Sequence, residues 1–353
     1  MLAAWLVCDT YRQLCARPFA LRCALDERTN RRRVREDAAV RAAVLHEHGI
    51  PRADDFAEPS AADGDQAVLD VLAAGLNPVD VAICAGRFYA GKPPLPSVAG
   101  REGVGLLDGR RVYFDSPVLP YGSMAERALI DPRATYDVPD GVEDGVAVAL
   151  GISGLAAWLA LTWRTSLQPN EHVLVLAASG VLGQIAVQAA KSLGAGRVVA
   201  AARSPDGLQR CLELGADAAV ALDGSDDLAA KLAQAADGRI DVVVDPLFGE
   251  PFAAAVNAAS FGARIVQLGA GAGAESTVAS APIRGKMLVI MGHTNFAAPP
   301  EVKREAYASL SALAATGELR IEIEPIELER VQEAWARLHA GSHRKIVLVP
   351  PGR

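Results

Sequence analysis

One stretch of the chain has the residue types and spacing of a phosphate-binding turn. Four apolar residues, Val173–Leu176, lead into the small-residue run Ala177-Ala178-Ser179-Gly180-Val181-Leu182-Gly183. Bare backbone at Gly180 and Gly183 would let a pyrophosphate approach the backbone N–H groups and the positive end of a following helix. We therefore predict a dinucleotide site at Ser179, Gly180, Val181, Leu182 and Gly183. The usual first glycine is Ala178 here, so a methyltransferase-like or purely structural turn is the alternative.

A second feature indicates which dinucleotide binds. Arg197–Ala202 has the pattern of a strand, and Arg203 follows it, twenty residues after Gly183. An acidic residue in this place binds the ribose 2′-hydroxyl of NAD, whereas an arginine suits the 2′-phosphate of NADP. Ser204, next in the chain, offers no competing carboxylate. We predict NADPH as the cofactor, bound here by Arg203 and Ser204, the alternative being a solvent-exposed arginine at a strand end.

Helices and strands alternate around this turn and would position it. Apolar residues at helical spacing run from Leu182 to Leu193, and Gly194 is where that helix would stop. Six strands with helices between them predict a doubly wound parallel sheet. The strands are expected at Val173–Leu176, Arg197–Ala202, Ala218–Leu222, Ile240–Asp245, Arg264–Leu268 and Met287–Met291, and the later helices at Leu208–Leu214, Leu228–Ala236 and Pro251–Ala259. Gly269 follows a strand, so it is expected at the ligand-binding carboxyl edge unless it belongs to a flexible loop.

The rest of the chain has a different pattern. Short strand patterns separated by Gly, Pro and Asp predict a compact β-rich unit, and Gly145–Trp163 has apolar residues at the spacing of a helix that leads into the parallel sheet. The strands are expected at Ala42–Leu45, Ala67–Ala73, Val104–Leu107, Val112–Phe114, Glu126–Ile130 and Lys345–Val349, and amphipathic helices at Val302–Thr316 and Leu328–His339. His46, His48, His339 and His343 are interpreted as surface residues.

Composition limits the possible functions. The chain has 353 residues, 51% of them hydrophobic, and a formal net charge of -7, which argues against nucleic acid as a partner. The five cysteines form neither a disulfide framework nor a zinc cluster, which fits a reducing compartment, and no stretch is judged long and apolar enough to cross a bilayer. We expect a cytoplasmic protein without a membrane partner. Residues 1–39 are interpreted as an extension outside the fold, with an ordered N-terminal helix as the alternative.

Several motifs together resemble the medium-chain dehydrogenase/reductase superfamily, in its zinc-independent quinone oxidoreductase-like branch. They cover the chain from about residue 40 to its end: Ala74-Gly75-Leu76-Asn77-Pro78-Val79-Asp80, Pro93-Pro94-Leu95-Pro96, Gly100-Arg101-Glu102-Gly103-Val104-Gly105, Gly122-Ser123-Met124-Ala125-Glu126, the Ala177–Gly183 turn, Leu214-Gly215-Ala216-Asp217 and Lys345-Ile346-Val347-Leu348. The resemblance implies a GroES-like β-rich catalytic domain from residues 40–159 and 296–353, and a Rossmann NADP-binding domain from residues 160–295. It also implies a homodimer formed through the cofactor domain.

The resemblance implies that this chain needs no zinc. Zinc-using members carry a Cys near the position of Asn77 and a His in the place of Arg101. Arginine cannot coordinate zinc, because it is always protonated, and Glu102 is then left without partners for a metal site. Asn77 is the candidate donor or orienter for the substrate, with a structural turn role as the alternative. Tyr89 is a candidate hydroxyl donor, with packing on the Pro-rich connector as the alternative.

Two functions remain open at this point. The first is an NADPH-dependent enzyme that transfers hydride to a small-molecule acceptor, a quinone or a related α,β-unsaturated carbonyl. Such acceptors delocalise the negative charge, so one or two neutral donors could replace a metal. The second is a non-catalytic NADPH-binding sensor or structural protein on the same fold. Only the first function predicts that an acceptor causes NADPH oxidation.

Overall fold

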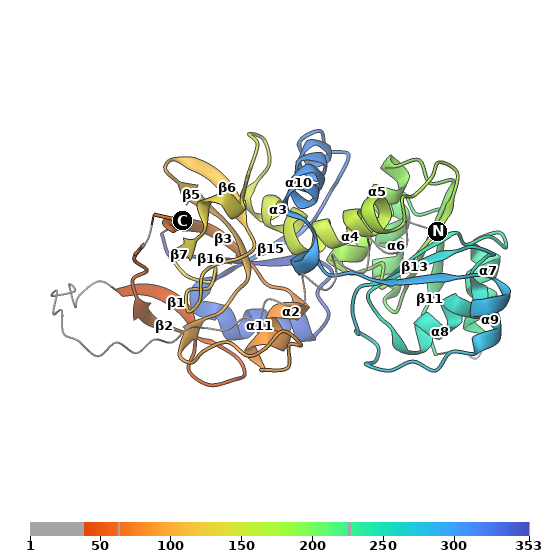
Figure 1. The fold of residues 1–353 in the computed structure, drawn as a ribbon, viewed down its shortest axis with the longest axis horizontal. Helices are drawn as coiled ribbons and strands as arrows, with labels where there is room; N and C mark the ends of the chain where they lie inside the picture. The colour runs from red at the N-terminus through yellow and green to blue at the C-terminus, as the bar shows by residue number, and fades with distance from the viewer. Residues whose placement is uncertain (1–38, 63, 225–226, 353) are drawn as a thin grey trace, which may run out of the picture. The chain divides into compact units, whose positions relative to one another are not determined.

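The computed structural model describes residues 39–62, 64–224 and 227–352 (Figure 1). Residues Ala39–Arg353 form one compact unit, divided from Met1–Ala38. The expectation that residues 1–39 form an extension therefore lies outside the described residues, apart from Ala39, which begins the first strand. The predicted domain boundaries at residues 159/160 and 295/296 stay a prediction.

A six-stranded sheet with only parallel neighbours confirms the doubly wound fold. Its strand order is β11-β10-β9-β12-β13-β14. The strands are β9 His172–Leu176, β10 Arg197–Ala202, β11 Ala218–Ala221, β12 Val242–Asp245, β13 Arg264–Gln267 and β14 Val289–Gly292. The central strand β9 is followed directly by the Ala177–Gly183 turn. The order reverses at β9, so this turn lies at the point where such sheets bind ligands.

Helices cover both faces of the parallel sheet (Figure 1). Alternate strand residues point to opposite faces: Val173 and Val175 share a core with α5 and α6, while Leu174 and Leu176 share one with α7 and α8. The helices are α5 Val181–Ser192, α6 Pro205–Glu213, α7 Leu228–Ala235, α8 Gly249–Ala258 and α9 Ser280–Gly285. This burial on both faces is why the central strands β9, β10 and β12 are largely apolar runs.

The other strands form two mainly antiparallel sheets. One has the order β2-β1-β4, and the other has the order β15-β16-β3-β5-β6-β8, with β7 paired to β3. Their strands are β1 Ala39–Leu45, β2 Arg52–Ala57, β3 Ala67–Gly75, β4 Ser97–Val98, β5 Glu102–Leu107, β6 Arg110–Phe114, β7 Arg127–Ile130, β8 Thr135–Asp137, β15 Ile323–Glu327 and β16 Lys345–Val349. Helices α2 Pro78–Cys84, α10 Pro300–Ala315 and α11 Val331–His339 accompany them. The last strand, β16, pairs with β3 from the start of the chain.

A long apolar helical segment connects the antiparallel and parallel sheets. It runs through α3 Asp144–Ala149, the π-helical turn η2 Leu150–Gly154, α4 Leu155–Leu159 and a second π-helical turn, η3 Ala160–Arg164, with a kink at Gly151. By length and composition it could cross a membrane, so the expectation that no stretch qualifies is wrong. However, 67% of its most apolar window is buried inside the protein. Its apolar residues belong to the core shared with α5 and α10.

Candidate active site

The predicted phosphate-binding turn leads directly into the start of α5. Gly180 is the N-cap of α5 and provides no side-chain cap, so the first-turn N–H groups have no partner from that residue. A Cβ atom at Gly183 would lie 2.4 Å from the Ala177 carbonyl oxygen and 2.5 Å from the Ala178 Cα atom. Only glycine therefore lets α5 begin this close to the turn. Val181 and Leu182 form the first residues of the helix.

The remaining predicted cofactor residues lie at the same edge of the sheet. Arg203 follows β10 and is exposed. Ser204 is the N-cap of α6, where its hydroxyl accepts a hydrogen bond from the Gly207 N–H at 3.1 Å. Gly269 follows β13, and a Cβ atom there would lie 2.9 Å from the Pro246 carbonyl oxygen. The carboxyl ends of β9, β10 and β13 thus carry all the predicted cofactor residues.

The acid Glu102 lies at the centre of a buried polar cluster that the sequence did not predict. Glu102 is 0% exposed and Lys345 is 1% exposed, and the Lys345 Nζ donates to Glu102 Oε1 at 2.7 Å. The Asn77 Nδ2 donates to the same oxygen at 2.8 Å. The other oxygen, Oε2, accepts hydrogen bonds from the Tyr113 hydroxyl at 2.9 Å and from the Ile152 N–H at 2.6 Å. Four donors therefore satisfy a carboxylate that the sequence analysis left without partners for a metal.

The side-chain amide of Asn77 uses its full hydrogen-bonding capacity within the cluster. Its Oδ1 accepts from Lys345 Nζ at 2.6 Å and from Ser153 Oγ at 3.3 Å. Its Nδ2 donates to Glu102 and to Asp80 Oδ2, the latter at 3.3 Å. Asn77 is also 3% exposed. In this arrangement its amide orients neighbouring groups and has no N–H left to donate to a substrate.

The carboxyl group of Asp80 contacts both the cluster and the start of α2. Its Oδ2 accepts a hydrogen bond from the Asn77 backbone N–H at 2.8 Å, as expected for a carboxyl group that bonds backbone locally. Burial, and secondly the charge of Glu102, raise the pKa of Asp80 to about 6. Its other oxygen, Oδ1, is buried and has no hydrogen-bond partner among the described residues. A raised pKa is the expected response to such burial.

Tyr89 lies in a different environment from Asn77. Its side chain is 76% exposed, and its hydroxyl donates to Thr294 Oγ1 at 3.1 Å. Its neighbour Phe88 contacts the Phe296 ring edge-on, with ring centroids 5.6 Å apart. No described contact joins Tyr89 to Asn77. The two residues predicted to act on the substrate are therefore a buried orienting residue and an exposed hydroxyl.

Sequence reasoning missed the residues that connect two segments of the chain: the η2 turn, which leads into the parallel sheet, and the segment after β14, which leaves it. Asn295 is buried, and its Nδ2 donates to the Ile152 carbonyl at 2.9 Å while its Oδ1 lies 2.9 Å from His293 Nε2. Ile152 also donates its N–H to Glu102, so one peptide segment connects the buried cluster with the segment after β14. Burial lowers the pKa of His293. A polar His-Thr-Asn run directly after an apolar strand is the signal that could have found this segment.

His46, His48 and His339 are exposed, as expected, whereas His343 is only partly exposed. Its ring is partly buried and contacts two predicted cofactor residues, with Nδ1 3.1 Å from the Ser179 carbonyl oxygen and Nε2 3.1 Å from Ser204 Oγ. Gln184 of α5 donates to the Ser179 and His343 carbonyls, both at 2.8 Å. The segment before β16 is thereby bonded to the phosphate-binding turn.

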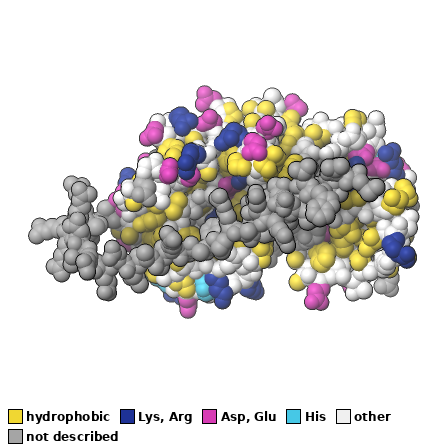
Figure 2. All heavy atoms as spheres, in the orientation of Figure 1, with side chains coloured by type: hydrophobic (Ala, Val, Ile, Leu, Met, Phe, Trp, Pro, Cys, Tyr) yellow, Lys and Arg dark blue, Asp and Glu magenta, His cyan; other side chains and the backbone are white. Residues whose placement is uncertain are grey.

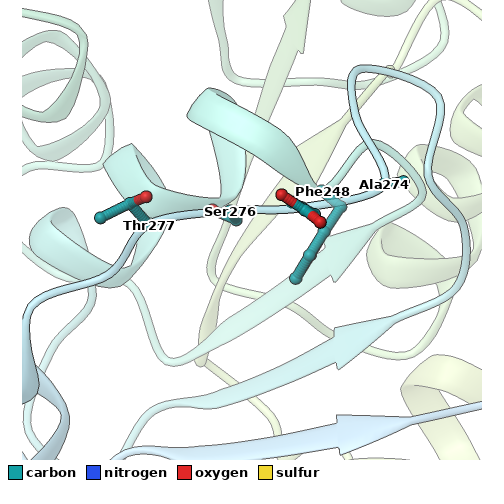
Figure 3. A pocket seen from close by; sticks show the side chains of 5 residues that line it. Phe248, Ala274, Ser276 and Thr277 are labelled. Atoms are coloured by element: carbon teal, nitrogen blue, oxygen red, sulfur yellow. The ribbon is translucent and has the colours of Figure 1, made fainter.

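The described hollows of the surface do not coincide with these residues. One open hollow of about 510 Å³ is lined by Phe248, Ala274, Glu275, Ser276 and Thr277, beside the start of α8 (Figure 3). None of the predicted site residues lines it. On the face drawn in Figure 2, side chains of both charges are interspersed, as expected from the small excess of acidic residues.

Comparison with known proteins gives the family. A family described as "Zinc-binding dehydrogenase" matches residues 181–312. The chain is 30% identical over 264 residues to "Quinone oxidoreductase-like protein 2" of Rattus norvegicus, covering 71% of this chain and 74% of the relative. The chain belongs to the medium-chain dehydrogenase/reductase superfamily, in its quinone oxidoreductase-like branch. The human "Quinone oxidoreductase" is 27% identical over 321 residues, which is 86% of this chain and 95% of that protein.

Solved structures agree with membership of this superfamily. The quinone oxidoreductase from Thermus thermophilus, solved alone and with NADPH, has a TM-score of 0.70 and 29% identity, covering 88% of this chain and 99% of that one. A mycobacterial quinone oxidoreductase has a TM-score of 0.78 at 21% identity, covering 88% of this chain and all of that one, and supports the fold alone. The predicted fold class is confirmed.

We predict that the Glu102–Lys345 pair is essential for stability. Glu102→Gln and Lys345→Met should each lower the free energy of unfolding by about 3–5 kcal/mol, because each leaves a buried charge without its partner. The double variant should lose less than the sum of the two, since it buries neither charge. Urea unfolding followed by circular dichroism measures this. Arg110→Gln, which breaks the exposed pair with Asp137, is the control and should change little. Additive losses would contradict the predicted coupling.

Proposed function

We propose that this protein is an NADPH-dependent oxidoreductase that transfers hydride to a quinone or a related α,β-unsaturated carbonyl without zinc. The observation that carries the proposal is the uncapped start of α5 beside Arg203, at the carboxyl edge of the parallel sheet. When bound, NADPH would supply the hydride. Its pyrophosphate fits the turn at Ser179–Gly183, and its 2′-phosphate fits the corner formed by Arg203 and Ser204. Gly269 would let the cofactor approach the backbone after β13.

The buried cluster supports a reaction without zinc. A dication beside Glu102 would need this carboxylate as a ligand, but the Lys345 ammonium already neutralises it at 2.7 Å. Arg101 places a second cation next to Glu102 in the chain, and its Nη2 donates to the Asp115 carbonyl at 3.4 Å. The residues at these positions therefore do not fit a zinc ion. No group of three or more His, Cys, Asp or Glu suited to a metal occurs among the described residues.

The acceptor would then depend on neutral donors. Reduction of a quinone or enone spreads the negative charge over the conjugated system, so a single hydroxyl can provide useful stabilisation. We propose that Tyr89 donates to the acceptor oxygen: its exposed hydroxyl donates to Thr294 Oγ1, in the segment after β14, and would exchange this hydrogen bond for one to the acceptor. Asn77 acts through its neighbours, since its amide holds the Ser153 hydroxyl at 3.3 Å.

We also propose a cytoplasmic location. Cys84 and Cys211 are free and buried, which suits a reducing compartment.

The proposed activity predicts that quinones or enones oxidise NADPH in the presence of the protein. Absorbance at the NADPH band, followed for a panel of quinones, enones and aldehydes, should fall fastest with the first two classes. Tyr89→Phe should lower turnover about tenfold while cofactor binding is unchanged, because it removes one hydrogen-bond donor. Chelator treatment is the control for zinc and should leave the rate unchanged. NADPH binding without oxidation by any acceptor would favour a sensor instead.

Cofactor choice gives a separate prediction. NADPH should bind more tightly than NADH, and Arg203→Ala should weaken NADPH binding ten- to a hundredfold while hardly changing NADH binding. A guanidinium grips phosphate by paired, charge-assisted hydrogen bonds that contribute about 1.5–3 kcal/mol. Fluorescence titration of the unmodified protein and of Arg203→Ala with each cofactor measures the dissociation constants. Asp206, exposed in the first turn of α6, is the competing group that could select the hydroxyl. Equal losses for both cofactors would refute the role of Arg203.

We further propose that the protein forms a homodimer through β14. This strand is at the edge of the parallel sheet and pairs with β13 on one side. Val289 is 46% exposed and Ile290 is 40% exposed, and Met287, just before the strand, is 65% exposed. An exposed apolar edge strand is a ready site for pairing with another strand. A second copy of β14 offers the same apolar edge, as a two-fold interface requires.

The dimer proposal predicts that a charge on this edge separates the subunits. Sedimentation velocity of the unmodified protein should show a dimer, and Ile290→Lys should shift it to a monomer. Ile50→Lys places the same charge on an apolar residue that is 54% exposed between β1 and β2, and should leave the dimer intact. A monomeric unmodified protein would overturn the proposal, as would a dimer that withstands Ile290→Lys.

A further inference from the structure

Three chain segments that are distant in sequence meet at the imidazole of His343. Its Nδ1 lies 3.1 Å from the Ser179 carbonyl oxygen, in the turn before α5. Its Nε2 lies 3.1 Å from Ser204 Oγ, at the start of α6. His343 itself precedes β16, the strand that carries Lys345. The ring thus spans the two segments whose residues we propose to bind NADPH.

The contact is close because Gly207 has no side chain. A Cβ atom at residue 207 would lie 2.4 Å from Ser179 Cβ and 3.2 Å from His343 Cε1. Any larger residue would push the start of α6 away from the turn and from the ring. Gly207 also donates its N–H to Ser204 Oγ, so the residue that makes room for the ring also fixes the hydroxyl that the ring contacts.

The position of His343 is fixed from the parallel-sheet side as well. Gln184 is 4% exposed on α5, and its Nε2 donates to the His343 carbonyl and to the Ser179 carbonyl. One turn further along α5, Gln188 bonds the backbone of Arg320 in both directions, at 3.0 and 2.8 Å. These two buried glutamines hold the C-terminal part of the chain against the cofactor-binding helix. The position of the His343 ring is therefore fixed by hydrogen bonds to its backbone and to both ring nitrogens.

Both ring nitrogens have a protein partner, and Nε2 is the one whose contact a ligand could replace. The Ser179 carbonyl can only accept, so Nδ1 carries a hydrogen atom. Nε2 then accepts from the Ser204 hydroxyl in the neutral ring and would donate in the imidazolium form. A phosphate oxygen that replaced the Ser204 hydroxyl at Nε2 would accept from this nitrogen, so it would bind the form of the ring that carries a hydrogen atom on both nitrogens.

We propose that His343 is a specificity-determining residue that binds the 2′-phosphate of NADPH together with Arg203 and Ser204. The inference rests on the proposed cofactor and extends it, since the third ligand comes from the segment before β16 and not from the parallel sheet. Binding of the phosphate would then bond the C-terminal segment to the cofactor. The charged residues next to these contacts in the chain are Arg203, which precedes Ser204, Asp206 in the first turn of α6, and Arg344, which follows His343 and is paired with Glu322 at 3.1 Å.

Isothermal titration calorimetry with 2′,5′-ADP and 5′-AMP tests this role without turnover. The unmodified protein should bind 2′,5′-ADP more tightly. His343→Asn keeps an N–H that can reach the Ser179 carbonyl but removes Nε2, and it should weaken 2′,5′-ADP binding about tenfold with 5′-AMP unchanged. His343→Gln, whose amide can reach the Nε2 position, should recover part of the loss. His339→Asn, at the end of α11, is the matched control and should change neither ligand.

The outcomes separate this inference from the proposed function. A protein that binds both nucleotides equally would overturn the NADPH preference, and the role of His343 with it. A clear preference for 2′,5′-ADP that His343→Asn does not reduce would overturn the role of His343 alone. If His343→Asn weakens the binding of both nucleotides equally, His343 only supports the turn. If the variant binds both nucleotides more tightly, the ring must be displaced for the nucleotide to bind. Either result would overturn the proposed role. Circular dichroism of each variant confirms that it is folded.

Discussion

The ion pair between Glu102 and Lys345 is the interaction on which the rest of this structure depends. Removing two charges from water costs more free energy than a bare pair recovers, so a buried pair persists only when its remaining hydrogen-bonding groups are satisfied. Here both Glu102 oxygens accept two hydrogen bonds each. The donors come from β16, β6, the start of α2 and the η2 turn. A single carboxylate thus fixes four segments that are remote in sequence.

The η2 turn shows what this constraint achieves. Glu102 accepts the Ile152 N–H, and Asn295 donates to the Ile152 carbonyl, so one peptide segment is held from two directions. This segment leads the chain into the parallel sheet, and Asn295 lies where the chain leaves it. The segment that enters the parallel sheet and the segment that leaves it are therefore both linked by hydrogen bonds to the buried Glu102 carboxylate, the second one through Ile152. An apolar core alone is non-directional and would fix their relative position less sharply.

The sequence predicted most of the fold because each signal was local. The central parallel strands β9, β10 and β12 are buried on both faces and stand out as apolar runs, and β10 and β16 were predicted to the residue. The sequence analysis missed β2, β4, β8 and β15. Of these, β2, Arg-Ala-Asp-Asp-Phe-Ala, is largely exposed and carries charges that hide its alternation. The short helix α2 begins at Pro78, directly after Asn77, which the sequence analysis interpreted as a substrate-binding residue. With seven residues, α2 is too short to show a clear helical repeat of apolar residues.

The same reasoning explains which candidate site residues a pattern can propose. The Ser179–Gly183 turn and Arg203 follow strands at fixed local spacing, so pattern alone selects them as candidates. Lys345 and Glu102 are 243 residues apart, and His343 and Ser179 are 164 apart, so no spacing rule connects them. A lysine and a histidine near the chain end look like surface residues until the topology of β16 is known. Only the three-dimensional fold could reveal either contact.

That topology gives the last strand an unusual position in the molecule. β16 pairs with β3 on one side and β15 on the other, so its register is fixed within the antiparallel sheet. Lys345 begins the strand and neutralises the buried cluster, while His343, two residues earlier, contacts the turn before α5 and the start of α6. A shift of β16 by one residue would move both side chains at once. The proposed cofactor corner and the buried ion pair are therefore not independent: the register that satisfies Glu102 is the register that places His343 against Ser204.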